Sequence, residues 1–185
     1  MRIPIVVAVA LVFAACSGSC TASAQSAQAP SSDLAADLIA QLDDAANKIV
    51  QLAEVIPQEK YAWRPAEGVR SVSEVLIHVT GGNYYIPSFA GVKGPGVLPR
   101  DAEKSITEKA QVIDHVKRSF EHVRSALRAT SAADFDKPAK MFGRETTCRN
   151  VYLTTVMHAH EHLGQLIAYA RTNGIVPPWS AASGD

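Results

Sequence analysis

Four stretches of this 185-residue chain have the pattern of amphipathic helices, and in the first and the third the apolar residues recur at alternating spacings of three and four. That spacing places the apolar side chains on one face of an α-helix, and such a face is stable only when it packs against another element. The first stretch begins at Asp33 and ends before Pro57, which cannot continue a helix. Its apolar positions are Leu38, Leu42, Ala45, Ile49, Leu52 and Ile56.

Helix start and stop signals delimit the other three stretches. The second helix is predicted to begin at residues 71–74 (Ser-Val-Ser-Glu) and the third at residues 105–108 (Ser-Ile-Thr-Glu), since both tetrapeptides match the capping box. The fourth is predicted to run from about residue 150 to residue 173 and to be closed by Gly174. No alternating strand pattern lies between these stretches. The predicted fold class is therefore all-α, a four-helix bundle with long connections between the helices.

The N-terminus has the pattern of an export signal. Arg2 precedes an apolar run over residues 3–15, which is shorter than a stable membrane span requires, and Ala22-Ser23-Ala24 is a small-residue cleavage site. We therefore expect an exported protein, periplasmic or secreted, without a stable membrane span. The alternative is a lipoprotein anchored at Cys16, because residues 13–16 (Phe-Ala-Ala-Cys) resemble a lipobox.

These signals predict four parts of the chain. They are a signal peptide at residues 1–24, a disordered linker at 25–32, the bundle at 33–178 and a tail at 179–185. After cleavage at Ala24 the one remaining thiol would be Cys148, which has no partner for an internal disulfide. We expect Cys148 to be a small packing residue or a partly exposed thiol.

Charge composition excludes one class of partner. The chain carries 18 basic and 18 acidic residues and no basic block, so it lacks the features of a nucleic-acid-binding protein. An unidentified small-molecule substrate is the expected partner. A homodimer is compatible with a helical bundle, but nothing in the sequence establishes one.

Three histidines fall within five positions of the fourth predicted helix. His158 and His162 are four residues apart and stack one turn apart on one face, whereas His160 points roughly the opposite way. The spacing also places His158 and His162 on the predicted inward face. One interpretation is a pair of ligands for a divalent metal, and the other is a helix that is rich in histidine and binds none.

A third ligand candidate is His78, which lies within the apolar face of the second predicted helix. A buried histidine needs a hydrogen-bond partner or a metal, so on its own His78 fits either role. Together with His158 and His162 it would form a neutral three-ligand set that leaves positions of the metal open, where a water would be acidified toward neutrality. Weaker candidates for a catalytic or supporting role are Glu161 and Gln165, whose simpler interpretations are a surface carboxylate and a packing residue.

The residues around these histidines resemble a known family, the DinB (YfiT-like) superfamily. The resemblance covers about residues 33–178 and is most specific at the pattern His158-x-x-x-His162-x-Gly164-Gln165. It implies a four-helix bundle with a three-histidine divalent metal site at His78, His158 and His162, with zinc or nickel as the expected metal. Members with assigned chemistry include thiol-dependent transferases and isomerases. Also matching are Val75-Leu76-Ile77-His78, Tyr61-x-Trp63-Arg64-Pro65, Gly68-Val69-Arg70-Ser71, Leu166, Tyr169, Arg171, Gly174 and Pro177-Pro178.

Three functions follow from these features. The first is a metal-dependent enzyme, a hydrolase or transferase, that acts at the mouth of the bundle. The second is a non-catalytic metal-binding protein of the cell envelope. The third is a structural bundle without a metal, whose histidines bond to one another and to neighbouring polar groups.

Overall fold

The computed structural model describes residues 33–96 and 98–181 of the chain. The predicted signal peptide, the linker and the end of the predicted tail lie outside these residues. In chain order the elements are α1 (Leu34–Val55), the 3₁₀ helix η1 (Gln58–Lys60), α2 (Val72–Ser88), α3 (Ala102–Ser105), α4 (Lys109–Ala129), the 3₁₀ helix η2 (Asp134–Asp136), β1 (Pro138–Met141), β2 (Arg144–Thr147), α5 (Cys148–Thr172) and α6 (Pro178–Ala181).

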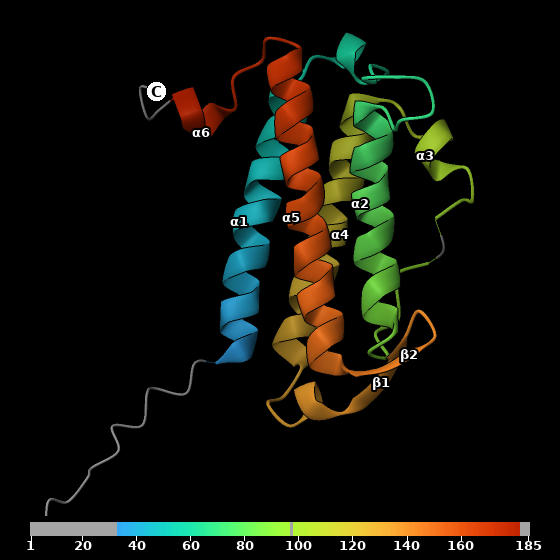
Figure 1. Cartoon of the computed structure of the whole chain (residues 1–185), viewed down its shortest axis with the longest axis vertical. Helices are drawn as coiled ribbons and strands as arrows, with labels where there is room; N and C mark the ends of the chain where they lie inside the picture. The colour runs from blue at the N-terminus through green and yellow to red at the C-terminus, as the bar shows by residue number, and fades with distance from the viewer. Residues whose placement is uncertain (1–32, 97, 182–185) are drawn as a thin grey trace, which may run out of the picture. The chain divides into compact units, whose positions relative to one another are not determined.

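The four long helices α1, α2, α4 and α5 form a bundle (Figure 1). Helices α1 and α2 each contact both α4 and α5, so α1 and α2 occupy opposite corners. In Figure 1, α1 and α5 run upward whereas α2 and α4 run downward. Because α2 and α4 are parallel neighbours, the chain must return along the bundle between them, which explains the long connection at residues 89–108. The predicted four-helix bundle is confirmed.

The apolar stripe predicted for α1 is the face that it buries. Leu42, Ile49 and Leu52 are fully buried, and Leu38 and Ile56 nearly so. The helix begins where the sequence indicates, because the side chain of its N-cap residue, Asp33, accepts a hydrogen bond from the Ala35 amide at 3.1 Å.

The capping box predicted for α2 is formed. The Ser71 amide donates to the Glu74 carboxylate at 2.8 Å, and the Glu74 amide donates to the Ser71 hydroxyl at 3.3 Å. The Glu74 side chain is buried, and it also accepts hydrogen bonds from Lys104 and Arg64 at 2.6 and 3.0 Å. This carboxylate therefore ties the start of α2 to α3 and to the loop before α2.

The capping box predicted at residues 105–108 is wrong. Ser105 ends the short helix α3, where its hydroxyl donates to the Asp101 carbonyl at 3.1 Å, and α4 begins only at Lys109. The first amide of α4 is capped from a distant segment instead, because the Lys109 N–H donates to the Gln58 side-chain oxygen at 2.7 Å. A local Ser-to-backbone bond thus competes with the cap that the sequence suggests.

The sequence also gave no sign of the hairpin formed by β1 and β2. These strands pair antiparallel with Met141 opposite Arg144, and each has four residues, too few for a clear alternating pattern. Ala139 and Met141 of β1 pack with Ile86, Cys148 and Val151 in a second small cluster. Cys148 is thus a buried packing residue, the first of the two predicted alternatives.

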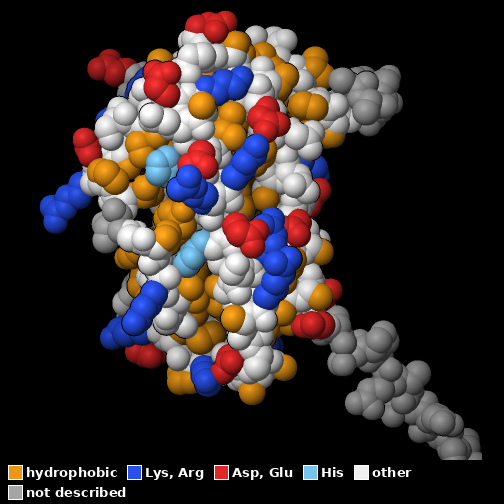
Figure 2. Space-filling view, turned by 180° about the vertical axis from the view of Figure 1, so that it is seen from behind, with side chains coloured by type: hydrophobic (Ala, Val, Ile, Leu, Met, Phe, Trp, Pro, Cys, Tyr) orange, Lys and Arg blue, Asp and Glu red, His pale blue; other side chains and the backbone are white. Residues whose placement is uncertain are grey.

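The surface of the described residues carries charges of both signs. Among the described residues, no helix is both long and apolar enough to cross a membrane. On the face shown in Figure 2, Lys and Arg side chains lie among Asp and Glu side chains rather than in a field of one sign. Helix α6 follows the bundle, and its Trp179 packs against the main core.

Replacing Glu74 with Gln is expected to lower the free energy of unfolding at pH 7 by about 1–3 kcal/mol, because the paired charge is lost. Burial raises the pKa of Glu74, but the hydrogen bonds from Lys104, the Ser71 amide and Arg64 outweigh it and hold the pKa below 4.5. A folded-state pKa below the unfolded one gives stability that is present above about pH 4.5 and lost below it. Urea unfolding should therefore show a smaller difference between wild type and variant at pH 3 than at pH 7.

The matched control for this test is Glu67→Gln, because Glu67 is an exposed carboxylate in the loop before α2. Its stability should equal that of wild type at both pH values. A Glu74→Gln deficit of the same size at pH 3 and pH 7 would contradict the ion-pair explanation.

Candidate metal centre

Helices α2 and α5 bring three histidine rings together. His78 comes from α2, and His158 and His162 come from α5. The ring centroids lie 5.1 Å apart for His78 and His158, 4.8 Å for His78 and His162, and 4.5 Å for His158 and His162. One nitrogen of each ring lies within 4.8 Å of the other two, and the Nε2 atoms of His78 and His158 are 3.2 Å apart.

The histidine pair of α5 lies beside the buried face of this helix rather than at its centre. The centre is formed by Ala159, Leu163 and Leu166, which are buried, whereas the rings of His158 and His162 are only partly buried. Both rings face His78 of α2 rather than solvent, as the prediction of an inward face requires. The pair sits at the edge of the core, where larger polar rings fit and a ligand can approach.

His160 faces away from this cluster, as its spacing predicts. Its Nε2 lies 3.1 Å from the Gln41 carbonyl oxygen on α1. The three histidines of α5 thus serve different contacts, two toward α2 and one toward α1.

A carboxylate fixes the proton position on His78. His78 Nδ1 lies 2.9 Å from the Glu103 carboxylate, which can only accept, so Nδ1 carries the proton in the neutral ring. The lone pair of the neutral ring is then on Nε2, which faces His158. Glu103 belongs to the short helix α3, so the long connection between α2 and α4 supplies part of the site.

A chain of hydrogen bonds fixes His162 in the same way. The Tyr169 hydroxyl donates to the Arg70 carbonyl at 3.0 Å, so it accepts from the Gln165 amide nitrogen at 2.9 Å. The amide oxygen of Gln165 then faces His162 Nδ1 at 2.8 Å, and this nitrogen must carry the proton. His162 Nε2 is therefore the unprotonated nitrogen in the neutral ring.

Arg70 supports both histidines without touching either ring. Its carbonyl ends the chain that orients His162, and its side-chain Nε donates to Glu103, the partner of His78, at 2.8 Å. Residue 70 precedes the capping box of α2, so the loop before this helix is part of the site.

A glycine makes room for the third ring. A Cβ atom on Gly82 of α2 would lie 2.3 Å from Cε1 and 2.7 Å from Nδ1 of His158, closer than any real contact. The His158 imidazole can lie against α2 only because residue 82 has no side chain. The neighbouring Gly81 has no such role, because a Cβ atom there would meet only a Leu98 methyl at 4.0 Å.

The environment favours the neutral form of two of the rings, His158 and His78. Burial lowers the pKa of His158 to about 4, with the neighbouring His162, His78 and Arg70 acting in the same direction. Burial also lowers the pKa of His78, although the hydrogen bond to Glu103 opposes the shift. Neutral imidazoles are the form that binds metals, so the site is prepared for a cation at neutral pH.

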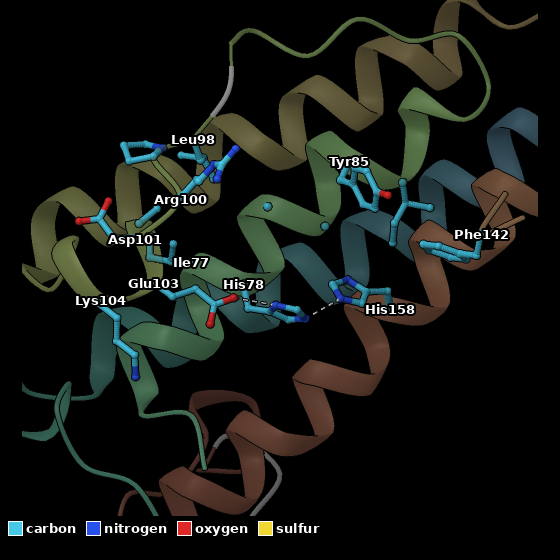
Figure 3. Close-up of a pocket in the computed structure, with 15 residues that line it drawn as sticks. Ile77, His78, Tyr85, Leu98, Arg100, Asp101, Glu103, Lys104, Phe142 and His158 are labelled. Atoms are coloured by element: carbon cyan, nitrogen blue, oxygen red, sulfur yellow. Dashed lines mark hydrogen bonds and ion pairs between the residues drawn. The ribbon is translucent and has the colours of Figure 1, made fainter. Parts of the chain in front are cut away.

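The cluster opens into a cavity of about 700 Å³ (Figure 3). His78 and His158 line one part of it, and the aromatic side chains of Tyr85 and Phe142 line another. Leu98 and the segment that follows it form a further wall. A cavity of this size accommodates a small organic molecule.

The donor set fits a divalent cation. Ligands at about 2.0–2.1 Å in a tetrahedral arrangement lie about 3.3 Å from one another, close to the 3.2 Å between Nε2 of His78 and Nε2 of His158. Two lone pairs at that distance repel unless a proton or a cation lies between them. The nitrogen pair at the upper limit of 4.8 Å requires a small side-chain rotation to close on the same ion.

His158 also has a buried nitrogen, Nδ1, without a hydrogen-bond partner among the described residues. The neutral ring carries one proton, which lies either on Nδ1 or on Nε2, where it is donated to His78. A cation that replaced the proton at Nε2 would release it to Nδ1 or to solvent.

A family model identifies the chain. The model of the DinB superfamily matches residues 41–166, more than half of the sequence. The chain belongs to the DinB superfamily. The predicted resemblance to this family is therefore confirmed. A search of curated proteins found no match to this DinB chain.

Solved structures share the fold of this DinB chain. A DinB-like protein from Bacillus cereus is 19% identical with a TM-score of 0.68, covering 76% of this chain and 93% of its own. YfiT from Bacillus subtilis, described as a probable metal-dependent hydrolase with an unusual four-helix bundle topology, is 15% identical with a TM-score of 0.61, and the match covers 80% of this chain and 93% of YfiT. At these identities the likeness shows the fold.

Sequence reasoning brought some residues of the DinB site to attention and missed others. His78, His158 and His162 lie together, and Gln165 contacts His162, whereas Glu161 is exposed on α5. Missed were Arg70, Gly82 and Glu103. Two adjacent glycines inside a predicted helix, at a cost of about 1 kcal/mol each relative to Ala, could have signalled the close approach at Gly82.

Replacing Gly82 with Ala is expected to raise the pKa of His158 from about 4 toward 6.5, because the new Cβ forces the ring out of its buried position. The measurement is a histidine NMR titration of the metal-free protein. Gly81→Ala is the matched control, since it adds the same methyl group with space available and should leave the pKa unchanged. An unchanged pKa in Gly82→Ala would show that the ring does not depend on this glycine.

Proposed function

We propose that this DinB protein is a metal-dependent hydrolase whose divalent cation, zinc or nickel, is bound by His78, His158 and His162. The observation that carries the proposal is the convergence of three imidazole nitrogens within 4.8 Å, in a cluster of which His78 and His158 line a cavity. Two of the rings have their protons fixed on the nitrogen that faces away from the cluster. The description of YfiT, a protein of similar fold, as a probable metal-dependent hydrolase agrees with this function.

A divalent cation with three neutral ligands retains its full charge, and it would supply Lewis acidity that acidifies water and polarises a carbonyl or phosphoryl oxygen. The chain itself orients the ligands. Glu103 holds the proton of His78 away from the cluster, and Gln165 does the same for His162. The walls of the cavity exclude bulk water from one side of a bound substrate.

The composition of the cavity favours hydrolysis over transfer through a covalent protein intermediate. Among the described residues that line it there is no Cys, Ser or Thr to serve as the attacking group, and the Glu103 carboxylate is bonded to Arg70 and His78. Its one lysine, Lys104, donates to the buried carboxylate of Glu74 at 2.6 Å. Water is the nucleophile that such a site can use without a protein side chain.

The test is to remove bound metal with a chelator, restore zinc or nickel, and assay carboxylic esters, phosphoesters and thiol acceptors. We expect hydrolysis that is lost on chelation and restored by one metal. His78→Ala, His158→Ala and His162→Ala should each bind the metal at least about tenfold more weakly and lose the activity. Metal affinity is measured by calorimetry and activity by product formation.

The matched control is His160→Ala, which removes an imidazole from the same helix but from the side that faces α1. It should keep both metal and activity. Tight metal binding without turnover would indicate a non-catalytic metal-binding protein, and transfer to a thiol would indicate a transferase. Either result would contradict the hydrolase, and unchanged metal content in His158→Ala would contradict the ligand set.

Glu103→Ala is expected to weaken zinc binding by about 10–100-fold, because the carboxylate that orients His78 is removed. Calorimetry on the variant and on wild type measures the change. Glu67→Ala, which removes an exposed carboxylate elsewhere, should bind zinc as wild type does. Equal affinities for all three proteins would mean that His78 needs no carboxylate partner.

We also propose that the protein acts outside the cytoplasm. The support is the apolar run at residues 3–15 with the cleavage site that ends at Ala24, and the alternative start at the lipobox cysteine, Cys16. The intact mass of the protein from fractionated cells distinguishes cleavage after Ala24 from processing at Cys16. A mature chain that begins at residue 25 supports soluble export, a lipidated Cys16 supports an anchored form, and an uncleaved chain in the cytoplasm refutes export.

A further inference from the structure

The tip of the hairpin holds an aromatic residue in an unfavourable backbone conformation. Phe142 has a φ of 51° and Gly143 a φ of 81°, in a two-residue turn between Met141 and Arg144. Such turns favour Asn-Gly, because a bulky side chain at positive φ clashes with the backbone. Turn formation therefore does not explain a phenylalanine at this position.

Core packing does not explain it either. The side chain of Phe142 is 60% exposed, and that of Tyr85 on α2 is 58% exposed. Their ring centroids are 6.3 Å apart, and Phe89 lies 5.1 Å from Phe142 and 5.0 Å from Tyr85. The exposed rings of Phe142 and Tyr85, together with the half-buried ring of Phe89, form an apolar surface of the kind that marks a binding site, which we call the aromatic rim.

The aromatic rim belongs to the cavity of the three-histidine cluster. Tyr85 and Phe142 line this cavity together with His78 and His158. Figure 3 shows Tyr85 and Phe142 on the side of His158, whereas Glu103 lies on the far side of His78. A molecule in the cavity can therefore contact the imidazoles with one end and the rim with the other.

Two of the four charged side chains that line the cavity are engaged elsewhere. Glu103 accepts hydrogen bonds from Arg70 and His78, and Lys104 donates to Glu74 and extends away from His78 in Figure 3. Arg100 and Asp101, which have opposite charges, are exposed neighbours at the edge. The described side chains that line the cavity thus include two basic groups and two carboxylates, so they do not by themselves select an anionic ligand.

We infer that the substrate is a neutral carboxylic ester with an aromatic ring on its acyl group, which packs against Tyr85 and Phe142 while the ester carbonyl faces the histidine cluster. In hydrolysis the oxygen of water joins the acyl carbon, the acyl C–O bond breaks, and the leaving alcohol takes a proton. The cleavage rests on the proposed function. The binding of the ring rests on the aromatic rim alone.

The test compares benzohydroxamate with acetohydroxamate on the zinc-loaded protein. The two probes share a metal-binding group and differ in the ring, so the ratio of their dissociation constants isolates the contact with the rim. We expect benzohydroxamate to bind at least about tenfold more tightly, as measured by calorimetry. In Phe142→Asn and in Tyr85→Ala the preference should fall to less than about threefold.

Phe142→Asn also separates binding from folding. Asparagine tolerates positive φ, so the variant should melt at the wild-type temperature or above it while it loses the preference for the ring. The matched control is Val176→Ala, which removes an exposed apolar side chain that does not line the cavity and should leave the preference intact. An absent preference in wild type, or one that survives in both rim variants, would overturn the inference.

A probe without a metal-binding group keeps the two proposals distinguishable. If neither hydroxamate binds the zinc-loaded protein, the proposal that the metal has an open coordination position is contradicted. Benzamide and acetamide then test the rim on the metal-free protein through the NMR resonances of Tyr85 and Phe142. Shifts caused by benzamide but not by acetamide support the aromatic rim, and no shift with either overturns it.

Discussion

The site depends on the close approach of α2 and α5 over one helical turn. The His158 ring lies where a side chain at position 82 would stand, so the two helices meet through an imidazole and a bare backbone. Glycine inside a helix destabilises it by about 1 kcal/mol relative to alanine. Gly82 therefore lowers the stability of α2 but lets the Nε2 atoms of His78 and His158 approach to 3.2 Å.

The other parts of the site serve to hold protons in place. Glu103 and the chain from Gln165 through Tyr169 each end on a group that can only accept, a carboxylate or a backbone carbonyl. Two imidazoles thus present a lone pair to the same small region before any cation arrives. Such preorganisation reduces the reordering of side chains that must accompany metal binding.

The sequence allowed the bundle and the histidine pair of α5 to be predicted because both depend on spacing within a single helix, whereas His78 was added from its place on the apolar face of α2 and from the family resemblance. Stripes such as Leu42, Ile49 and Leu52, and the i,i+4 pair of α5, follow from helix geometry. Glu103 could not be predicted, since it reaches His78 from a four-residue helix inside an irregular connection. The hairpin could not be predicted because a four-residue strand is too short for a clear pattern. The cap of α4 could not be predicted because Gln58, which supplies it, lies 51 residues away in the sequence.

The place of Arg70 makes the two supported histidines thermodynamically dependent on each other. Its guanidinium holds the partner of His78, and its carbonyl ends the chain that reaches His162. A displacement of this one residue would disturb both rings, although it touches neither, so losses at Glu103 and Gln165 are not independent of one another. His78 and His162 would then lose their fixed orientations together, because both depend on Arg70 in the loop before α2.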